Sequence, residues 1–112
     1  MALPIERRLK KELDFKRVLK TGNTYRGILL FIKYTTSPNT PSRFGITVSA
    51  KISKKAVVRN RIRRLLSETI QAHALSKTSG YDTVVVVTKQ SLLDLDAYRK
   101  DLLSVLDQVG II

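Results

Sequence analysis

The stretch from Arg43 to Arg64 reads RFGITVSAKISKKAVVRNRIRR and decides the fold, because its hydrophobic period changes part of the way along. Over residues 43–50 apolar side chains alternate with polar or small ones, which predicts a β-strand. From Ala56 to about Ala74 the period is helical, which predicts a long amphipathic helix. The apolar stripe of that helix consists of Val58, Ile62, Leu65, Leu66, Thr69 and His73. We therefore expect a strand that leads into a helix with one buried face.

The segments before this stretch predict one helix and one more strand. Phe15, Val18 and Leu19 have helical spacing ahead of Gly22, which predicts a short helix over about residues 12–21. Residues 28–36 are rich in β-branched, aromatic and other apolar side chains, which predicts a strand covered on much of both faces. Residues 37–42 contain turn-forming residues, so this strand and strand 43–50 are expected to pair as a hairpin with a long loop.

The segments after it predict a buried strand and a last helix. Residues 81–89 include four consecutive valines, which is typical of a central strand. The apolar spacing from Leu95 to Val109 predicts a helix that Asp94 or Asp96 caps and Gly110 ends. The expected class is α+β: an α–β sandwich with helices packed on a small mixed sheet, in a single domain covering residues 1–112.

The charge of the chain points to a polyanionic partner. Its 112 residues hold 21 Lys and Arg against 9 Asp and Glu, a net charge of +12. Residues 1–64 carry 17 of the basic residues and only 3 of the acidic ones. No secretory signal and no apolar run of membrane-spanning length is seen, so we expect a cytoplasmic protein that binds nucleic acid and no membrane.

The sequence offers no catalytic or metal-binding set of its own. It has no cysteine, which excludes a thiol nucleophile. It has one histidine, His73, and no set of nucleophile, base and orienting residue can be assembled around it. We expect His73 to be a packed or half-buried helix residue. Asp94, Asp96 and Asp101 stand near the start of a predicted helix, where capping is a better explanation than metal binding.

Seven basic residues and no acidic one lie between Lys51 and Arg64. A solvated helix face would normally include Glu residues for pairing one turn apart, and here none occurs before Glu68. Arginine suits bidentate contacts to phosphate, so phosphate binding is favoured. The predicted RNA-binding residues are Lys51, Lys54, Lys55, Arg59, Asn60, Arg61, Arg63 and Arg64.

The segment AVVRNRIRR, residues 56–64, resembles the protein subunit of bacterial ribonuclease P. The strand Phe44–Ser49 before it and the N-terminal Arg8–Lys11 with Asp14, Phe15 and Gly22 are also similar to that family. Two departures stand out. Ser53-Lys54-Lys55 occupies a position where many members have a glycine, and Leu19 stands where some members carry a second aromatic residue.

The resemblance implies a ribosomal protein S5 domain 2-like fold with four strands and a left-handed β–α–β crossover through the basic helix, residues 28–36 then forming two strands. It implies an accessory subunit of an endoribonuclease that removes the 5′ leader from precursor tRNA, with the RNA subunit and its Mg²⁺ as the catalyst. It also implies that the protein binds the RNA subunit through the basic helix and the leader through a cleft. The best cleft candidates are Phe15 and Phe31, with Tyr34 as a substitute.

Two other functions are compatible with the charge. A ribosomal or RNA-chaperone protein without a role in hydrolysis would show the same balance. A DNA-binding regulator is the weaker alternative, because no partner helix of a helix-turn-helix is seen and no DNA is expected as a ligand.

Overall fold

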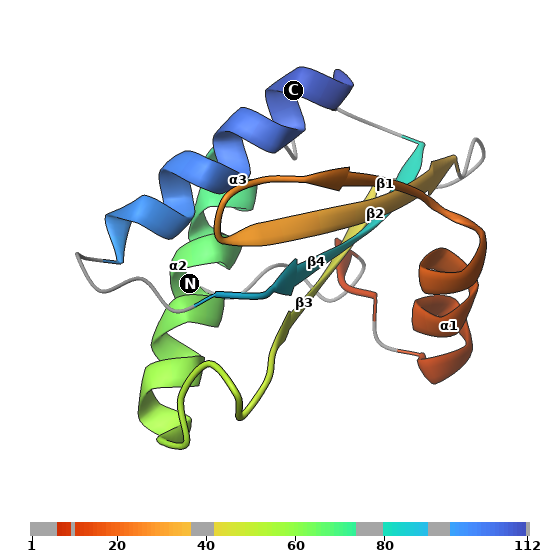
Figure 1. The fold of residues 1–112 in the computed structure, drawn as a ribbon. Helices are drawn as coiled ribbons and strands as arrows, with labels where there is room; N and C mark the ends of the chain where they lie inside the picture. The colour runs from red at the N-terminus through yellow and green to blue at the C-terminus, as the bar shows by residue number, and fades with distance from the viewer. Residues whose placement is uncertain (1–6, 10, 37–41, 74–79, 90–94, 112) are drawn as a thin grey trace.

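The computed structural model describes residues 7–9, 11–36, 42–73, 80–89 and 95–111, and within them it confirms the predicted α+β sandwich. A four-stranded sheet has α2 and α3 on one face and α1 on the other (Figure 1). The elements in chain order are α1 (Glu12–Thr21), β1 (Asn23–Arg26), β2 (Leu30–Thr36), β3 (Arg43–Val48), α2 (Ala56–His73), β4 (Tyr81–Val87) and α3 (Asp96–Val109).

The order of the strands corrects the predicted hairpin. The sheet runs β1-β2-β4-β3, with β4 antiparallel to β2 and parallel to β3, so strands β2 and β3 do not pair. The valine-rich β4 takes a central place because its side chains are apolar on both faces and need cover on both. The hairpin in the structure is instead β1–β2, where the Gly27 N–H donates to the Leu30 carbonyl at 2.8 Å.

The fourth strand is present, but residues 28–36 do not split to make it. It is β1, whose residues Asn23–Arg26 are all exposed and therefore carry no hydrophobic alternation. The parallel strands β3 and β4 are joined through α2, which is the β–α–β crossover that the resemblance implies. The left-handedness of this crossover stays a prediction.

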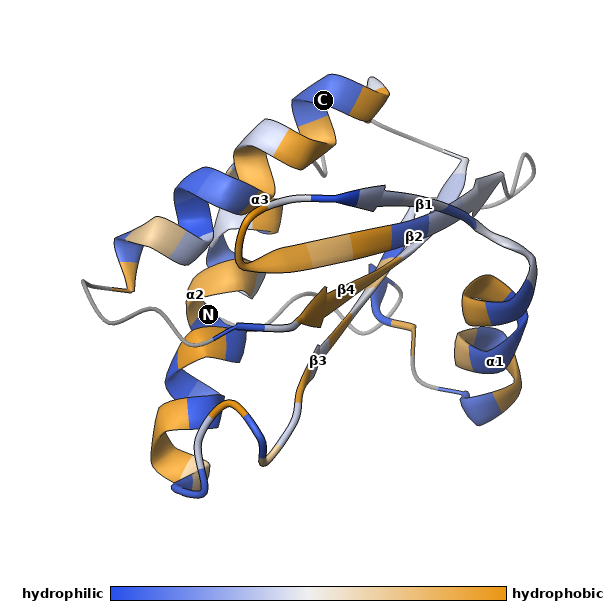
Figure 2. Cartoon of the chain, in the orientation of Figure 1, coloured by the Kyte–Doolittle hydropathy of each residue, from blue (hydrophilic) through white to orange (hydrophobic). Residues whose placement is uncertain are grey.

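The larger core lies between the sheet and the pair α2 and α3. Figure 2 shows hydrophobic colouring along much of β2 and β4, and hydrophobic and hydrophilic residues alternating along α2 and α3 beside them. In α2 the predicted stripe is confirmed at Ile62, Leu66 and Thr69, which are buried. His73 is exposed, so its prediction as a packed residue was wrong, and Ile70 is buried in the last turns instead.

A smaller core lies under α1 on the opposite face. Leu9, Val18 and Val84 are buried there, with Phe15 and Val86 packed against them. Gly22 follows α1 as predicted, yet its φ of −75° is one that any residue adopts. A glycine is required at position 22 because the backbone of Val18 lies so close: a Cβ atom there would be 2.5 Å from the Val18 carbonyl oxygen.

The ends of α3 differ in how well the sequence predicts them. Gly110 ends the helix in the left-handed conformation, with φ of 82°, as expected. Asp96 does not cap the helix: Leu95 is the N-cap residue, and the Asp96 carboxylate instead accepts from Arg99 Nε at 2.6 Å. Asp94, the other predicted cap, lies outside the described residues.

Candidate nucleic-acid interface

The basic segment faces solvent because the opposite side of α2 is buried in the core. Ile62 and Leu66 point into the core, which turns the intervening cationic residues outward. Of the predicted RNA-binding residues, Arg59 and Arg63 are half-buried on the flanks, and the others are exposed: Lys51, Lys54, Lys55, Asn60, Arg61 and Arg64. The structure therefore leaves all eight at least partly open to solvent, in α2 or in the loop that enters it.

Two of these side chains also make internal contacts. Arg59 Nη1 donates to the Ser53 carbonyl at 2.8 Å and so holds the loop that enters α2. Arg63 Nη2 donates to the side-chain oxygen of Asn60. Arg59 thus has a structural hydrogen bond that its place beside the apolar stripe did not reveal. Among the described residues, Arg61 and Arg64 show no side-chain hydrogen bond of this kind.

The positive charge of this surface has few carboxylates near it; Glu68, one helical turn after Arg64, interacts with that arginine electrostatically. The first turn of α2 contains no acidic residue. Within the part of the chain that the structure describes, no ion pair joins a carboxylate to Arg59, Arg61, Arg63 or Arg64. Stacked like charges on a helix destabilise it modestly. A polyanion that binds here would relieve that repulsion.

A groove of about 640 Å³ runs along the outer edge of β3, beside the basic surface. It joins four segments that are distant in sequence: the N-terminal residues, α1, β3 and α2. Its lining consists of Arg8, Leu9, Phe15, Phe44, Gly45, Ile46, Asn60, Arg63, Arg64 and Ser67. We call this space the edge groove. It combines the ring of Phe15, an apolar floor that includes the buried Phe44, and a cationic rim.

Gly45 shapes the edge groove by leaving room for Phe15. A Cβ atom at position 45 would lie 2.4 Å from Cζ of the Phe15 ring, closer than any real contact. The ring therefore lies directly on the backbone of β3. A glycine inside a strand often marks the close approach of another group. Gly45, inside β3, is such a sequence signal for the position of the groove.

The three predicted cleft aromatics do not come together. Phe15 lines the edge groove, but Phe31 does not. Phe31 pairs with Val86, so it lies on the face that α1 covers, and its ring centroid is 5.2 Å from the guanidinium carbon of Arg26. Tyr34 lies on the opposite face, packed on the larger core and edge-to-face with Tyr81 at 6.4 Å. Tyr34 therefore cannot share a cleft with Phe15.

Sequence reasoning missed several residues of the groove, among them Ile46 and Ser67. Ser67 lies one turn beyond the basic motif, and Ile46 reaches the groove from a strand that was expected only to fill the core. Arg8 belongs to the N-terminal segment that is similar to the family, but no local pattern places it at the groove. Its bridge to Phe44 brings the N-terminal segment alongside β3.

The two buried carboxylates of the described residues, Asp82 and Asp101, are engaged elsewhere in the fold. Asp82 accepts hydrogen bonds from Arg17 and Arg43, and the Asp101 carboxylate accepts from three backbone N–H groups. Among the described residues, no three His, Asp or Glu side chains are grouped so as to hold a metal ion. No helix in the same ranges is long and apolar enough to cross a membrane.

The fold and this surface define a small, strongly basic α+β protein with the interface of an RNA-binding protein. Comparison with known proteins identifies the family. Residues 3–110 match the family model described as Ribonuclease P, so the chain belongs to the ribonuclease P protein family. Its curated relatives carry the name of a protein component of ribonuclease P, and the ribosomal or RNA-chaperone alternative finds no support among them.

Two relatives and two solved structures show how far the similarity extends. The ribonuclease P protein component of Synechocystis is 36% identical, over 100% of this chain and 92% of its own length. That of Dictyoglomus thermophilum is 38% identical, over 91% of this chain and 86% of its own length. The Staphylococcus aureus RNase P protein superposes with a TM-score of 0.85 at 26% identity, covering 94% of this chain and 96% of that one. The RNase P protein from Thermotoga maritima superposes with a TM-score of 0.78 at 26% identity, covering 90% of this chain and 96% of that one.

Proposed function

We propose that this subunit uses two adjoining surfaces in ribonuclease P: the basic face of α2 for the RNA subunit, and the edge groove for the 5′ leader of precursor tRNA. The observation that carries the proposal is the edge groove itself, because it places the Phe15 ring beside Asn60, Arg63 and Arg64. Aromatic rings stack on unpaired bases of any sequence, and arginine side chains neutralise the phosphates between them.

The groove suits a single strand better than a duplex. At about 640 Å³ it has room for a few nucleotides at most. The Phe15 ring can stack only on an unpaired base, and the other aromatic residue of the lining, Phe44, is buried. The exposed cations that lie outside the groove, including Lys54, Lys55 and Arg61, suit the folded backbone of the RNA subunit. Arg63 and Arg64 stand where the two surfaces meet.

Magnesium enters this proposal through the RNA subunit. The described carboxylates form no cluster that would hold the ion, and Asp14, which precedes the groove residue Phe15, is in contact with Arg43. The role of the protein is to bind and orient RNA around the metal ions that the RNA holds. Hydrolysis of the phosphodiester is then the chemistry of the RNA and its Mg²⁺.

Replacing Phe15 by alanine tests the leader proposal. We expect precursor tRNA to bind the holoenzyme about 1–3 kcal/mol more weakly, because base stacking on an aromatic ring contributes that much. Mature tRNA has no leader, so its affinity should stay the same. Equilibrium binding of both RNAs to holoenzyme made with each variant measures the difference.

Leu13→Ala is the matched control for this test. Leu13 is an apolar residue of the same helix, 78% exposed and outside the groove, so its loss should change neither affinity. Equal weakening for precursor and mature tRNA, together with a large drop in melting temperature, would reduce Phe15 to a packing residue. Truncation of a buried Phe costs about 3–5 kcal/mol of folding stability.

Replacing Arg61 or Arg64 by alanine tests the α2 surface. Each variant should bind the RNA subunit more weakly and lower the slope of log affinity against log salt by about 0.7 to 0.9, because one phosphate contact is lost. Arg59→Ala should also lose stability, since it gives up the bond to Ser53. Lys100→Ala, a 76% exposed cation on α3, is the charge-matched control. Unchanged slopes for both arginines would show that this face does not meet RNA.

A further inference from the structure

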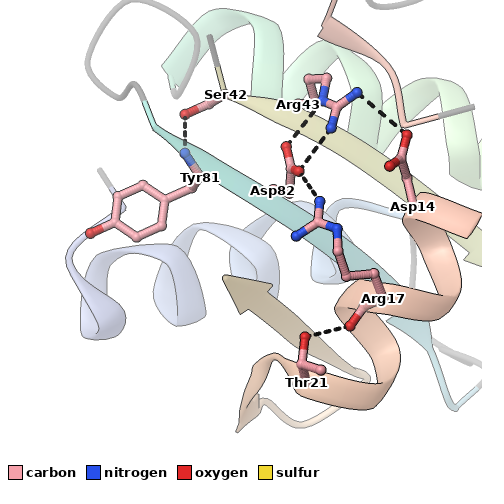
Figure 3. A network of polar contacts seen from close by, with 7 residues as sticks. All are labelled: Asp14, Arg17, Thr21, Ser42, Arg43, Tyr81 and Asp82. Carbon is pink, nitrogen blue, oxygen red and sulfur yellow. Dashed lines mark hydrogen bonds and ion pairs between the residues drawn. The ribbon is translucent and has the colours of Figure 1, made fainter. Parts of the chain in front are cut away.

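A carboxylate is buried where the sequence of the central strand would lead one to expect another apolar residue. Asp82 is the second residue of β4, and its side chain is completely covered. A buried charge of this kind persists only if it is paired and hydrogen-bonded. Figure 3 shows two guanidinium groups converging on it from different elements, Arg43 of β3 and Arg17 of α1.

The Asp82 carboxylate is used fully. Arg43 donates to it as a fork, from Nε to Oδ1 at 3.1 Å and from Nη2 to Oδ2 at 2.9 Å. Arg17 Nη2 donates to the same Oδ2. The third nitrogen of the Arg43 group lies 3.5 Å from Oδ2 of Asp14, back on α1. We call Asp14, Arg17, Arg43 and Asp82 the α1 clamp.

The members of the α1 clamp surround the Phe15 site in sequence. On the helix, Asp14 comes directly before Phe15 and Arg17 two residues after it. On the sheet, Arg43 is two residues before Gly45, so it points to the same face as the glycine on which the Phe15 ring lies. The clamp therefore ties both sides of the Phe15 contact to one buried group.

Apart from the clamp, α1 is held by the packing of Phe15 and Val18 on the smaller core and by the hydrogen bond that Lys33 Nζ donates to the Leu19 carbonyl at 2.8 Å. Val18 is its one buried residue, and no side chain caps its N-terminus. Each helix residue advances by about 100°, so a modest rotation would carry the Phe15 ring off Gly45 and out of the groove. The hydrogen bonds that Arg43 donates to Asp82 raise the pKa of Arg43 above its ordinary value, so this member of the clamp stays charged.

We propose that Asp82, acting through Arg17 and Arg43, is a positioning residue that orients α1 so that Phe15 presents its ring to the leader. The inference rests on the proposed role of the edge groove and deepens it. In this account the clamp does not touch RNA. It matters for binding only when a leader is present to meet Phe15.

Arg17→Ala is the variant that tests the clamp. Asp82 keeps the Arg43 fork in this variant, so the protein should still fold, whereas Asp82→Ala would remove the acceptor that Arg17 and Arg43 share and leave Arg43 only its 3.5 Å contact with Asp14. Precursor tRNA should bind the holoenzyme roughly fivefold more weakly, with mature tRNA unchanged. Arg17→Lys retains one charged donor and should recover most of the loss. Lys20→Ala removes an exposed charge from the same helix and should change neither affinity.

A double-mutant cycle with Phe15→Ala separates positioning from direct contact. If Arg17 acts through Phe15, the variant with both changes should bind precursor tRNA no more weakly than Phe15→Ala alone. The salt dependence should also be unaltered by Arg17→Ala, since no phosphate contact is lost. Three results would each contradict the positioning role of the clamp. They are a double variant that binds precursor tRNA more weakly than Phe15→Ala alone, a reduced salt slope for Arg17→Ala, and equal weakening of mature tRNA binding by Arg17→Ala.

The same measurements distinguish failure of the clamp from failure of the groove. If Phe15→Ala weakens precursor binding and Arg17→Ala does not, the groove stands and the positioning role of the clamp is refuted. If Phe15→Ala has no leader-dependent effect, the proposed groove is refuted, and the clamp falls with it because there is no leader contact to orient.

Discussion

The isolated protein is expected to leave precursor tRNA uncut, and cleavage is expected to appear when a ribonuclease P RNA subunit and Mg²⁺ are added. The reason lies in how the chain uses its reactive groups. It has no cysteine and a single histidine, His73, which is exposed at the end of α2. The buried carboxylates Asp82 and Asp101 are consumed by structural hydrogen bonds. Gel analysis of labelled precursor with each component omitted in turn measures the effect, which should be all or none.

Contaminating RNA is the main hazard in that experiment. Protein pretreated with nuclease and repurified under denaturing conditions provides the control. If cleavage returns when the RNA subunit is added back to this protein, the activity is that of the holoenzyme. Cleavage by the RNA-free protein at the mature 5′ end, surviving the nuclease step, would contradict the assignment of catalysis to RNA.

Asp101→Ala should destabilise the fold more than any change on the RNA-binding surface. The Asp101 carboxylate, on α3, accepts hydrogen bonds from the N–H groups of Ile28, Leu29 and Leu30 at 3.0, 2.9 and 3.2 Å. These donors belong to the β1–β2 turn and lie against a side chain that is only 9% exposed. Leaving them without an acceptor should cost about 3–6 kcal/mol, a large part of the stability of a small domain.

Two companion variants make that measurement specific. Asp101→Asn keeps one acceptor oxygen and should cost less, about 1–2 kcal/mol. Asp107→Ala changes an exposed carboxylate of the same helix and should stay within about 0.5 kcal/mol. Denaturant unfolding gives all three values. A cost below about 1 kcal/mol for Asp101→Ala would mean that the turn does not depend on this carboxylate.

Local sequence patterns were sufficient wherever a segment buries one face. The stripe of α2 around Ile62 and Leu66 follows from helical spacing alone, and so does the outward basic face beside it. The left-handed end of α3 follows from Gly110, and the buried character of β4 from its valines. In these segments each side chain is placed by its own backbone period, so no distant residue has to be known.

Pairing between distant segments could not be predicted in the same way. Nothing local says that β4 inserts between β2 and β3, because backbone N–H and C=O groups are the same in every strand. The polar β1 exists because β2 offers it an open edge, and its own exposed residues give no signal. The family resemblance supplied the number of strands, but the residues of the fourth were found only in the structure.

The sequence by itself determined the helices, the valine-rich strand and a cationic helix face suited to phosphate. The tertiary structure alone decided that Phe15 of α1 and Arg63 of α2 line one groove at the edge of β3, and that Tyr34 does not line it. It also decided the partners of Asp82, which come from two other elements. The physical reason is that charge and hydrophobic period are properties of one segment, whereas a groove and a buried ion pair exist only where segments far apart in the chain are packed together.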